Sequence, residues 1–221
     1  MARQKGSSIL GNLRGRVGTV VFTDYNGTPV VKSLPTRKED WEPTARQLKV
    51  YARFRVVMDF LQLFKPVIDI GFVQPRKSKM SGFNKAVSYH LLNVLNNKQG
   101  QPKIDFEKVI FSKPLKTTQQ CWNAKMIAEE GRKITVSWQP NPYPDKGTEP
   151  DDHIILAFYC KENNIMSRCV TEGVFRTNLT HSSRFSESTI GHEIVGYMFV
   201  VSPDGKLVSE TEYLGTVIVL P

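Results

Sequence analysis

The chain has 221 residues, of which 40% are hydrophobic and 23% are charged, and these proportions are typical of a folded globular protein. They exclude wholesale disorder, which requires low hydrophobicity together with high net charge. Three cysteines are too few for a disulfide framework. The length fits one large domain or two small ones.

Positive charge is concentrated in the first half of the chain. Residues 1–116 hold 21 basic and 8 acidic residues, a net charge of +13, whereas residues 117–221 hold 9 and 13, a net charge of −4. This asymmetry indicates that the first half meets a polyanion or an acidic protein surface. The alternative is a basic surface that serves only solubility.

The first residues contain no apolar run of the length that a secretory signal requires. The most apolar stretch, residues 56–72, is interrupted by charged residues and by Pro66, so we expect no membrane-spanning segment. Cys121, Cys160 and Cys169 lack metal-ligand spacing and are expected to be buried, reduced thiols. These features predict a cytoplasmic protein without a membrane partner, or a virion protein if a phage encodes it.

A β-hairpin is expected over residues 16–34, because two β-rich runs flank Asn26-Gly27, a dipeptide that supplies the positive φ angles of tight turns. Residues 35–43 form a polar linker, and Thr44 stands at a helix N-cap position. The next apolar residues have the spacing of a buried helical stripe: Leu48, Tyr51, Phe54, Val57, Met58, Leu61, Phe64 and Ile68. Pro66 either kinks this helix or begins a second one. Another helix is expected over residues 83–96.

Short apolar runs separated by turn residues follow Pro102, and almost no helical periodicity remains. The seven runs are Val109–Phe111, Ile134–Trp138, Ile154–Tyr159, Val174–Phe175, Ile194–Val201, Leu207–Val208 and Leu214–Val219. They predict an antiparallel β-sandwich. The expected fold class is therefore α+β, with a basic hairpin-plus-helical region over residues 1–102 and a sandwich over residues 105–221.

Residues 134–140, Ile-Thr-Val-Ser-Trp-Gln-Pro, resemble the second strand of a fibronectin type III domain, whose tryptophan lies in the core. Residues 196–201 and the Asp204-Gly205 turn resemble the last hairpin of that fold. Immunoglobulin-like topologies would give a similar pattern, so the strand order stays open.

The whole chain also resembles an uncharacterised protein family of Bacteroidetes. The matching residues are Gly11, Gly15, Gly18, Ser33-Leu34-Pro35, Thr44, Gln47, Arg53, Phe54, Gly71-Phe72, Ser81-Gly82-Phe83-Asn84, Ser88-Tyr89 and Tyr213-Leu214-Gly215. The resemblance implies an N-terminal hairpin with helices, a C-terminal sandwich and no known activity. Some similar sequences lie in phage-related settings, which suggests a virion or assembly role.

Motifs of catalysis are missing from the sequence. It has no Gly-x-Ser-x-Gly elbow, no Gly-Lys-Ser/Thr phosphate loop and no closely spaced histidine or cysteine pair. His90 is expected to be a hydrogen-bonded core histidine, and Asp151-Asp152-His153 a solvated loop between strands. We therefore expect no enzyme, and no catalytic, cofactor or metal site.

Basic residues form three clusters, in the glycine-rich N-terminus, on one face of the first helix and in the loop before the second helical region. These candidate polyanion-binding residues are Arg3, Lys5, Arg14, Arg16, Arg46, Lys49, Arg53, Arg76, Lys77 and Lys79. Together they would contact several phosphates without reading sequence.

Two hypotheses of function follow. The first is a non-catalytic structural or adaptor protein that self-associates or docks onto a larger assembly, with edge strands Val17–Phe22 and Leu214–Leu220 as candidate pairing surfaces. The alternative is a nonspecific nucleic-acid-binding protein that uses the basic N-terminal face.

Overall fold

The computed structural model describes residues 2–3, 13–25, 28–35, 41–73, 80–96 and 101–221. These residues form α-helices and antiparallel strands in several sheets, which confirms the predicted α+β class. The chain divides into two compact units, Met1–Leu48 and Lys49–Pro221.

The first unit contains a four-stranded antiparallel sheet with the order β1-β4-β3-β2. Its strands are β1 (Ala2–Arg3), β2 (Gly15–Val17), β3 (Val20–Tyr25) and β4 (Thr28–Ser33). The expected hairpin corresponds to β3 and β4, and the Asn26-Gly27 turn lies outside the described residues. The prediction of a free edge strand over Val17–Phe22 is wrong for the residues in β3, because β3 pairs with β2 on one side and with β4 on the other. Val17 itself lies in β2, which is an edge of the sheet.

The first and third helices begin at or within one residue of the predicted positions. They are α1 (Ala45–Leu63), α2 (Lys65–Gly71) and α3 (Gly82–Asn93). At the start of α1, the Gln47 N–H donates to Thr44 Oγ1 (3.3 Å) and the Thr44 N–H donates to Gln47 Oε1 (2.8 Å), which is a capping box. Pro66 lies in the first turn of α2, so this proline begins a second helix rather than kinking the first.

The apolar stripe of α1 is buried only in its second half. Val57 and Leu61 are buried, as expected. Leu48, Tyr51 and Phe54 were expected to be buried too, but each is about half exposed.

The second unit contains two antiparallel sheets packed face to face, one with the order β10-β9-β12-β13 and the other with the order β11-β8-β7. Their strands are β7 (Trp122–Glu129), β8 (Lys133–Gln139), β9 (His153–Cys160), β10 (Ile165–Val170), β11 (Thr180–Arg184), β12 (Glu193–Val201) and β13 (Glu212–Ile218). A small two-stranded sheet pairs β5 (Leu95–Asn96) with β6 (Lys103–Ile104).

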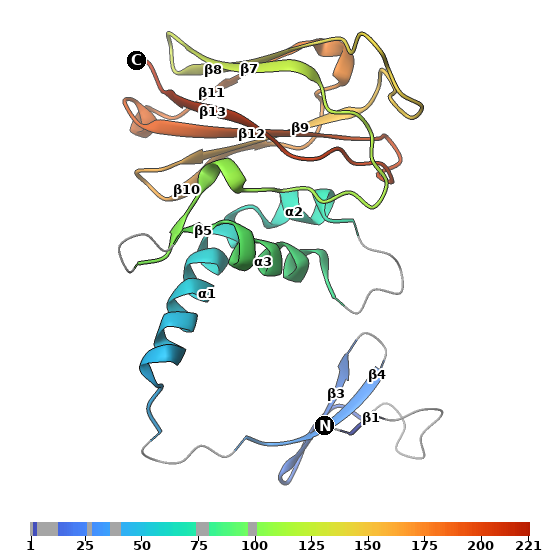
Figure 1. Cartoon of the computed structure of the whole chain (residues 1–221), viewed down its shortest axis with the longest axis vertical. Coiled ribbons are helices and arrows are strands. Elements are labelled where there is room, and N and C mark those ends of the chain that lie inside the picture. The colour runs from blue at the N-terminus through green and yellow to red at the C-terminus, as the bar shows by residue number, and fades with distance from the viewer. Residues whose placement is uncertain (1, 4–12, 26–27, 36–40, 74–79, 97–100) are drawn as a thin grey trace. The chain divides into compact units, whose positions relative to one another are not determined.

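The four-stranded sheet is buried on both faces, which explains why β9 and β12 are continuously apolar. Along β12, Ile194, Met198 and Val200 face the other sheet. The alternate residues, such as Tyr197 and Phe199, share a core with the helices. Figure 1 shows the resulting layers, with the helices α2 and α3 on one side of this sheet and β7 and β8 on the other. The expected boundary near residues 102–105 therefore lies inside the second unit.

Three of the seven expected strands are not strands in the structure. Val109–Phe111 is a buried irregular segment, and Phe175 and Val208 each form only an isolated bridge. Three others, β7, β10 and β11, were not predicted, because their sequences alternate or are largely polar.

Candidate functional site

The structure describes six of the ten predicted polyanion-binding residues. Lys5, Arg76, Lys77 and Lys79 lie outside the described residues. Arg3 is in β1. Arg16 is in β2 of the same sheet and Arg14 directly precedes this strand, and both side chains are exposed. Arg46, Lys49 and Arg53 lie on α1, where Arg46 and Lys49 are exposed.

Arg53 has a structural contact. Its Nη2 donates to the Leu91 carbonyl oxygen at 2.8 Å, and its Nε is buried without a partner among the described residues. Because this guanidinium joins α1 to α3, it contributes less to a phosphate-binding face than Arg46 or Lys49 does.

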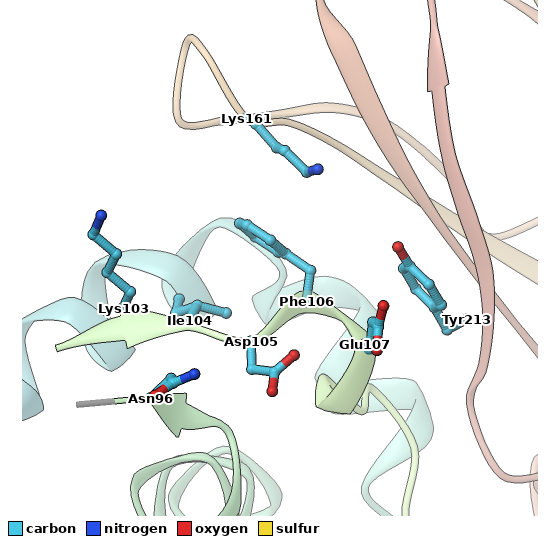
Figure 2. Close-up of a pocket in the computed structure, with 8 residues that line it drawn as sticks. All are labelled: Asn96, Lys103, Ile104, Asp105, Phe106, Glu107, Lys161 and Tyr213. Carbon is cyan, nitrogen blue, oxygen red and sulfur yellow. The ribbon is translucent and has the colours of Figure 1, made fainter. Parts of the chain in front are cut away.

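A hollow of about 500 Å³ lies beside the short helical turn η2 (Phe106–Lys108), and Figure 2 shows its lining. The lining residues are Asn96, Lys103, Ile104, Asp105, Phe106, Glu107, Lys161 and Tyr213. Lys161 Nζ lies 2.6 Å from Glu193 Oε2 and 5.7 Å from the centre of the Phe106 ring. Asp105 is paired with Lys108 at 2.8 Å. The hollow thus mixes charges of both signs, several of them already paired, and does not suit a polyanion.

A second depression, which we call the α3 groove, lies between α3 and residues 113–115. It has a volume of about 350 Å³ and is lined by Phe72, Val73, Met80, Lys85, Ser88, Tyr89, Leu92, Asn93, Lys113, Pro114 and Leu115. Three of its apolar side chains are unusually exposed for their size, Leu92 at 80%, Leu115 at 55% and Met80 at 45%. The groove therefore offers an apolar surface to solvent.

The charge around the α3 groove has one sign. Lys85 and Lys113 are the charged residues of its described lining, which contains no aspartate or glutamate. Lys113 Nζ lies 5.3 Å from the centre of the Tyr89 ring, within the range of a cation–π contact. An apolar floor beneath two ammonium groups suits a ligand that is itself apolar and acidic.

The acidic segment at residues 151–153 is not the solvated loop that we expected. Asp152 is fully buried, and its Oδ2 accepts from Arg176 Nη2 at 2.9 Å and from Arg176 Nε at 3.3 Å. Arg176 also donates to the Gln119 carbonyl oxygen at 2.8 Å, and its own carbonyl accepts from Trp138 Nε1 at 2.9 Å. This network joins several loops at one end of the two sheets and is structural.

His90 is the hydrogen-bonded core histidine that the sequence predicts. It is 1% exposed, and its Nδ1 lies 2.7 Å from the Ala86 carbonyl oxygen. Burial lowers the pKa of this imidazole to about 4, so His90 is neutral in the folded protein at neutral pH.

The structure brings together three potential ligands that the sequence does not connect. Cys160, Glu162 and His192 place their sulfur, oxygen and nitrogen atoms within 4.8 Å of one another. Only the pairing of β9 with β12 reveals this proximity, because His192 follows Cys160 by 32 residues.

A family comparison identifies the chain. Residues 12–215 match the model described as a family of unknown function, DUF6266. The chain belongs to the DUF6266 family. This membership agrees with the expected uncharacterised family and assigns no activity. A comparison with curated proteins gives no match.

The described part of this DUF6266 chain contains no helix that combines the length and the apolar character needed to cross a bilayer.

Proposed function

We propose that this DUF6266 protein is a non-catalytic docking module that binds a partner protein through the α3 groove. The observation that carries the proposal is the exposure of Leu92, Leu115 and Met80 around an aromatic floor with lysines at its rim. Exposed apolar clusters with a polar rim are typical of protein-binding surfaces.

The occupant that fits best is a partner segment with one or two bulky apolar side chains flanked by carboxylates. A volume of about 350 Å³ holds about that much side chain. The apolar groups would contact the Tyr89 ring and Leu92, and the carboxylates would meet Lys85 and Lys113. A neutral or basic segment would leave these two ammonium groups without complementary charge.

Such a contact is weak on its own. Burying one leucine or phenylalanine side chain is worth about 1.5–3 kcal/mol, and association costs translational and rotational freedom. We expect a dissociation constant near 1 mM for an isolated peptide, about 4 kcal/mol of binding free energy. Repeated copies in an assembly would raise the overall affinity through multivalency. We therefore propose an adaptor or structural role in a larger, phage-related particle, in which such repeated contacts would add together.

We also propose a fibronectin type III-like topology for residues 105–221. The division into a three-stranded and a four-stranded sheet supports it, as does Trp138 on β8, which is 3% exposed in the core between the sheets.

Nonspecific nucleic-acid binding is the competing function. Arg14, Arg16, Arg46 and Lys49 are exposed, and exposed basic residues can neutralise phosphates. Arg46 and Lys49 lie on α1, whereas Arg16 lies in β2 and Arg14 directly precedes it, and Arg16 Nε already donates to the Gly18 carbonyl oxygen at 2.9 Å. The apolar character of the α3 groove has no use in phosphate binding, so we favour a protein partner.

Peptides of defined composition test the docking proposal. The probe is a hexapeptide with a central Leu-Phe pair flanked by glutamates, and its matched control has lysines in their place. Nuclear magnetic resonance titration should show shifts at the α3 groove with the acidic peptide alone. The variants L92S and K113E should weaken its binding at least about fivefold, roughly 1 kcal/mol.

Two variants on β7 serve as matched controls. Ile127 is 51% exposed and Lys125 is also exposed, and both lie outside the groove. I127S and K125E should therefore leave peptide binding unchanged. Equal binding of the acidic and basic peptides, or no shift at the α3 groove with either, would overturn the proposal.

A further inference from the structure

Three potential metal ligands meet at one end of the four-stranded sheet. Cys160 is the last residue of β9, Glu162 lies in the turn between β9 and β10, and His192 immediately precedes β12. Ile194 lies opposite Cys160 in the β9–β12 register, which brings the start of β12 beside the end of β9. The cluster is therefore fixed by the central strands of the sheet.

Two of the three distances between the ligand atoms match a tetrahedral metal site, and all three atoms lie within 4.8 Å of one another. Cys160 Sγ lies 3.6 Å from His192 Nδ1 and 3.7 Å from Glu162 Oε2. Zinc binds sulfur at about 2.3 Å and nitrogen or oxygen at about 2.1 Å, so neighbouring ligand atoms of a tetrahedral site are about 3.4–3.6 Å apart.

The backbone around the cluster is well fixed. The Glu193 N–H donates to both carboxylate oxygens of Glu162, at 3.1 Å each. His192 is held on both sides, since its N–H donates to the Thr189 carbonyl and its own carbonyl accepts from the Val219 N–H. The Glu193 bonds orient the Glu162 carboxylate directly, as hydrogen bonds to ligand side chains do in metalloproteins, and the two main-chain bonds fix the position of the His192 backbone.

The three ligand types favour zinc over the other common divalent ions. A thiolate and an imidazole are poor ligands for calcium and magnesium, which prefer oxygen, whereas zinc takes sulfur, nitrogen and carboxylate oxygen together. Asn163 Nδ2 lies 3.4 Å from His192 Nδ1, a long contact that the amide would release when a metal takes that lone pair.

We infer that Cys160, Glu162 and His192 form a zinc-binding site. No fourth histidine, cysteine, aspartate or glutamate joins them among the described residues, so water or a partner's ligand completes the coordination. The bound ion would join the β9–β10 turn to the start of β12. This site is independent of the α3 groove, and it adds a metal-dependent clamp to the sheet.

Titration with metal alone tests the site. After dialysis against a chelator, the full chain should bind one Zn²⁺ by calorimetry. Co²⁺ in its place should give the visible bands of a four-coordinate ion and a near-ultraviolet thiolate charge-transfer band. Removal of Cys160 in C160S should abolish the charge-transfer band.

Glu162 provides a variant that is expected to fold, because its side chain is exposed and the amide of E162Q still accepts from Glu193. We expect E162Q to raise the zinc dissociation constant at least about tenfold. C169S and H153Q change a cysteine and a histidine outside the cluster and should bind like the parent chain. Binding that lacks the thiolate band, that survives C160S and E162Q, or that is lost in C169S would overturn the inference. An absence of one-to-one binding would overturn it too.

Discussion

The buried pair of Arg176 and Asp152 gives the sharpest test of how the second unit is held together. The Asp152 carboxylate is fully buried, and its Oδ1 has no hydrogen-bond partner among the described residues. The Arg176 guanidinium neutralises the carboxylate by donating to Asp152 Oδ2, and it also donates to the Gln119 carbonyl. Replacing this arginine in R176M would leave the buried carboxylate without a counter-charge, with only the Thr118 hydroxyl (3.4 Å) and the Glu149 N–H (3.3 Å) still donating to Oδ2.

The expected loss of unfolding free energy is large because the carboxylate would stay desolvated without its ion-pair partner. Removing one partner of a buried ion pair typically costs about 3–5 kcal/mol. For a domain of 150–250 residues each kcal/mol moves the unfolding midpoint by about 2–4 °C, so R176M should lower it by about 6–20 °C. The double variant R176M/D152L removes both charges and should lose less than R176M alone, because no unpaired charge remains.

Thermal and urea unfolding followed by tryptophan fluorescence provides the assay. Trp138 is a suitable reporter, since its Nε1 donates to the Arg176 carbonyl in the core. The exposed pair Lys65–Asp69 is the matched control, and K65M should cost about 0.5 kcal/mol or less. A loss below 1 kcal/mol in R176M, or a double variant less stable than R176M, would refute the argument.

Three further predictions concern stability. Folding lowers the His90 pKa from 6.5 to about 4, so as the pH falls the unfolded chain binds the proton before the folded chain does. The free energy of unfolding should therefore fall between pH 6.5 and 4 by up to about 3 kcal/mol relative to that of H90M. Parallel pH profiles of the two proteins would contradict this. The methyl group added in G71A would overlap the Phe111 carbonyl and should lower the free energy of unfolding in urea by about 1–3 kcal/mol. A loss near zero would show that the backbone adjusts freely and would contradict this. S81A removes the N-cap bond from the Asn84 N–H (3.2 Å) and should cost about 1 kcal/mol; unchanged stability would show that the cap is not needed.

Local signals in the sequence predict much of the fold. Thr44 caps α1, and the long apolar runs of β9 and β12 are strands, because capping and β-propensity act within a few residues. Pro66 begins α2, which is one of the two outcomes that the sequence left open. The helical layer over the sheet was not predicted. A continuous apolar strand shows that both faces are buried, but it does not say what covers them.

The weakly apolar strands were missed for a related reason. β11 has the sequence Thr-His-Ser-Ser-Arg and forms an edge of its sheet, where one neighbour and solvent exposure permit polar side chains. Val174–Phe175 is apolar enough to resemble a strand. In the structure Val174 packs in the core between the sheets, and Phe175 forms only an isolated bridge with His153.

The candidate sites could not be found from sequence because they join distant residues. Tyr89 and Leu92 lie on α3, whereas Leu115 lies in an irregular segment that follows the small two-stranded sheet of β5 and β6. The pairing of Cys160 with His192 depends on the register between β9 and β12, which apolar runs alone do not specify. The sequence around Asp152 likewise does not predict its ion pair with Arg176, because the two residues are 24 positions apart.

The measurement that separates the docking account most directly from nucleic-acid binding is size-exclusion chromatography with light scattering at about 50 mM and 500 mM salt, with and without duplex DNA. Phosphate contacts weaken by orders of magnitude over this range, whereas apolar contacts persist. The account predicts that elution of the protein is unchanged by DNA at either salt concentration. Co-elution with DNA at low salt that is lost at high salt would contradict it and favour nucleic-acid binding.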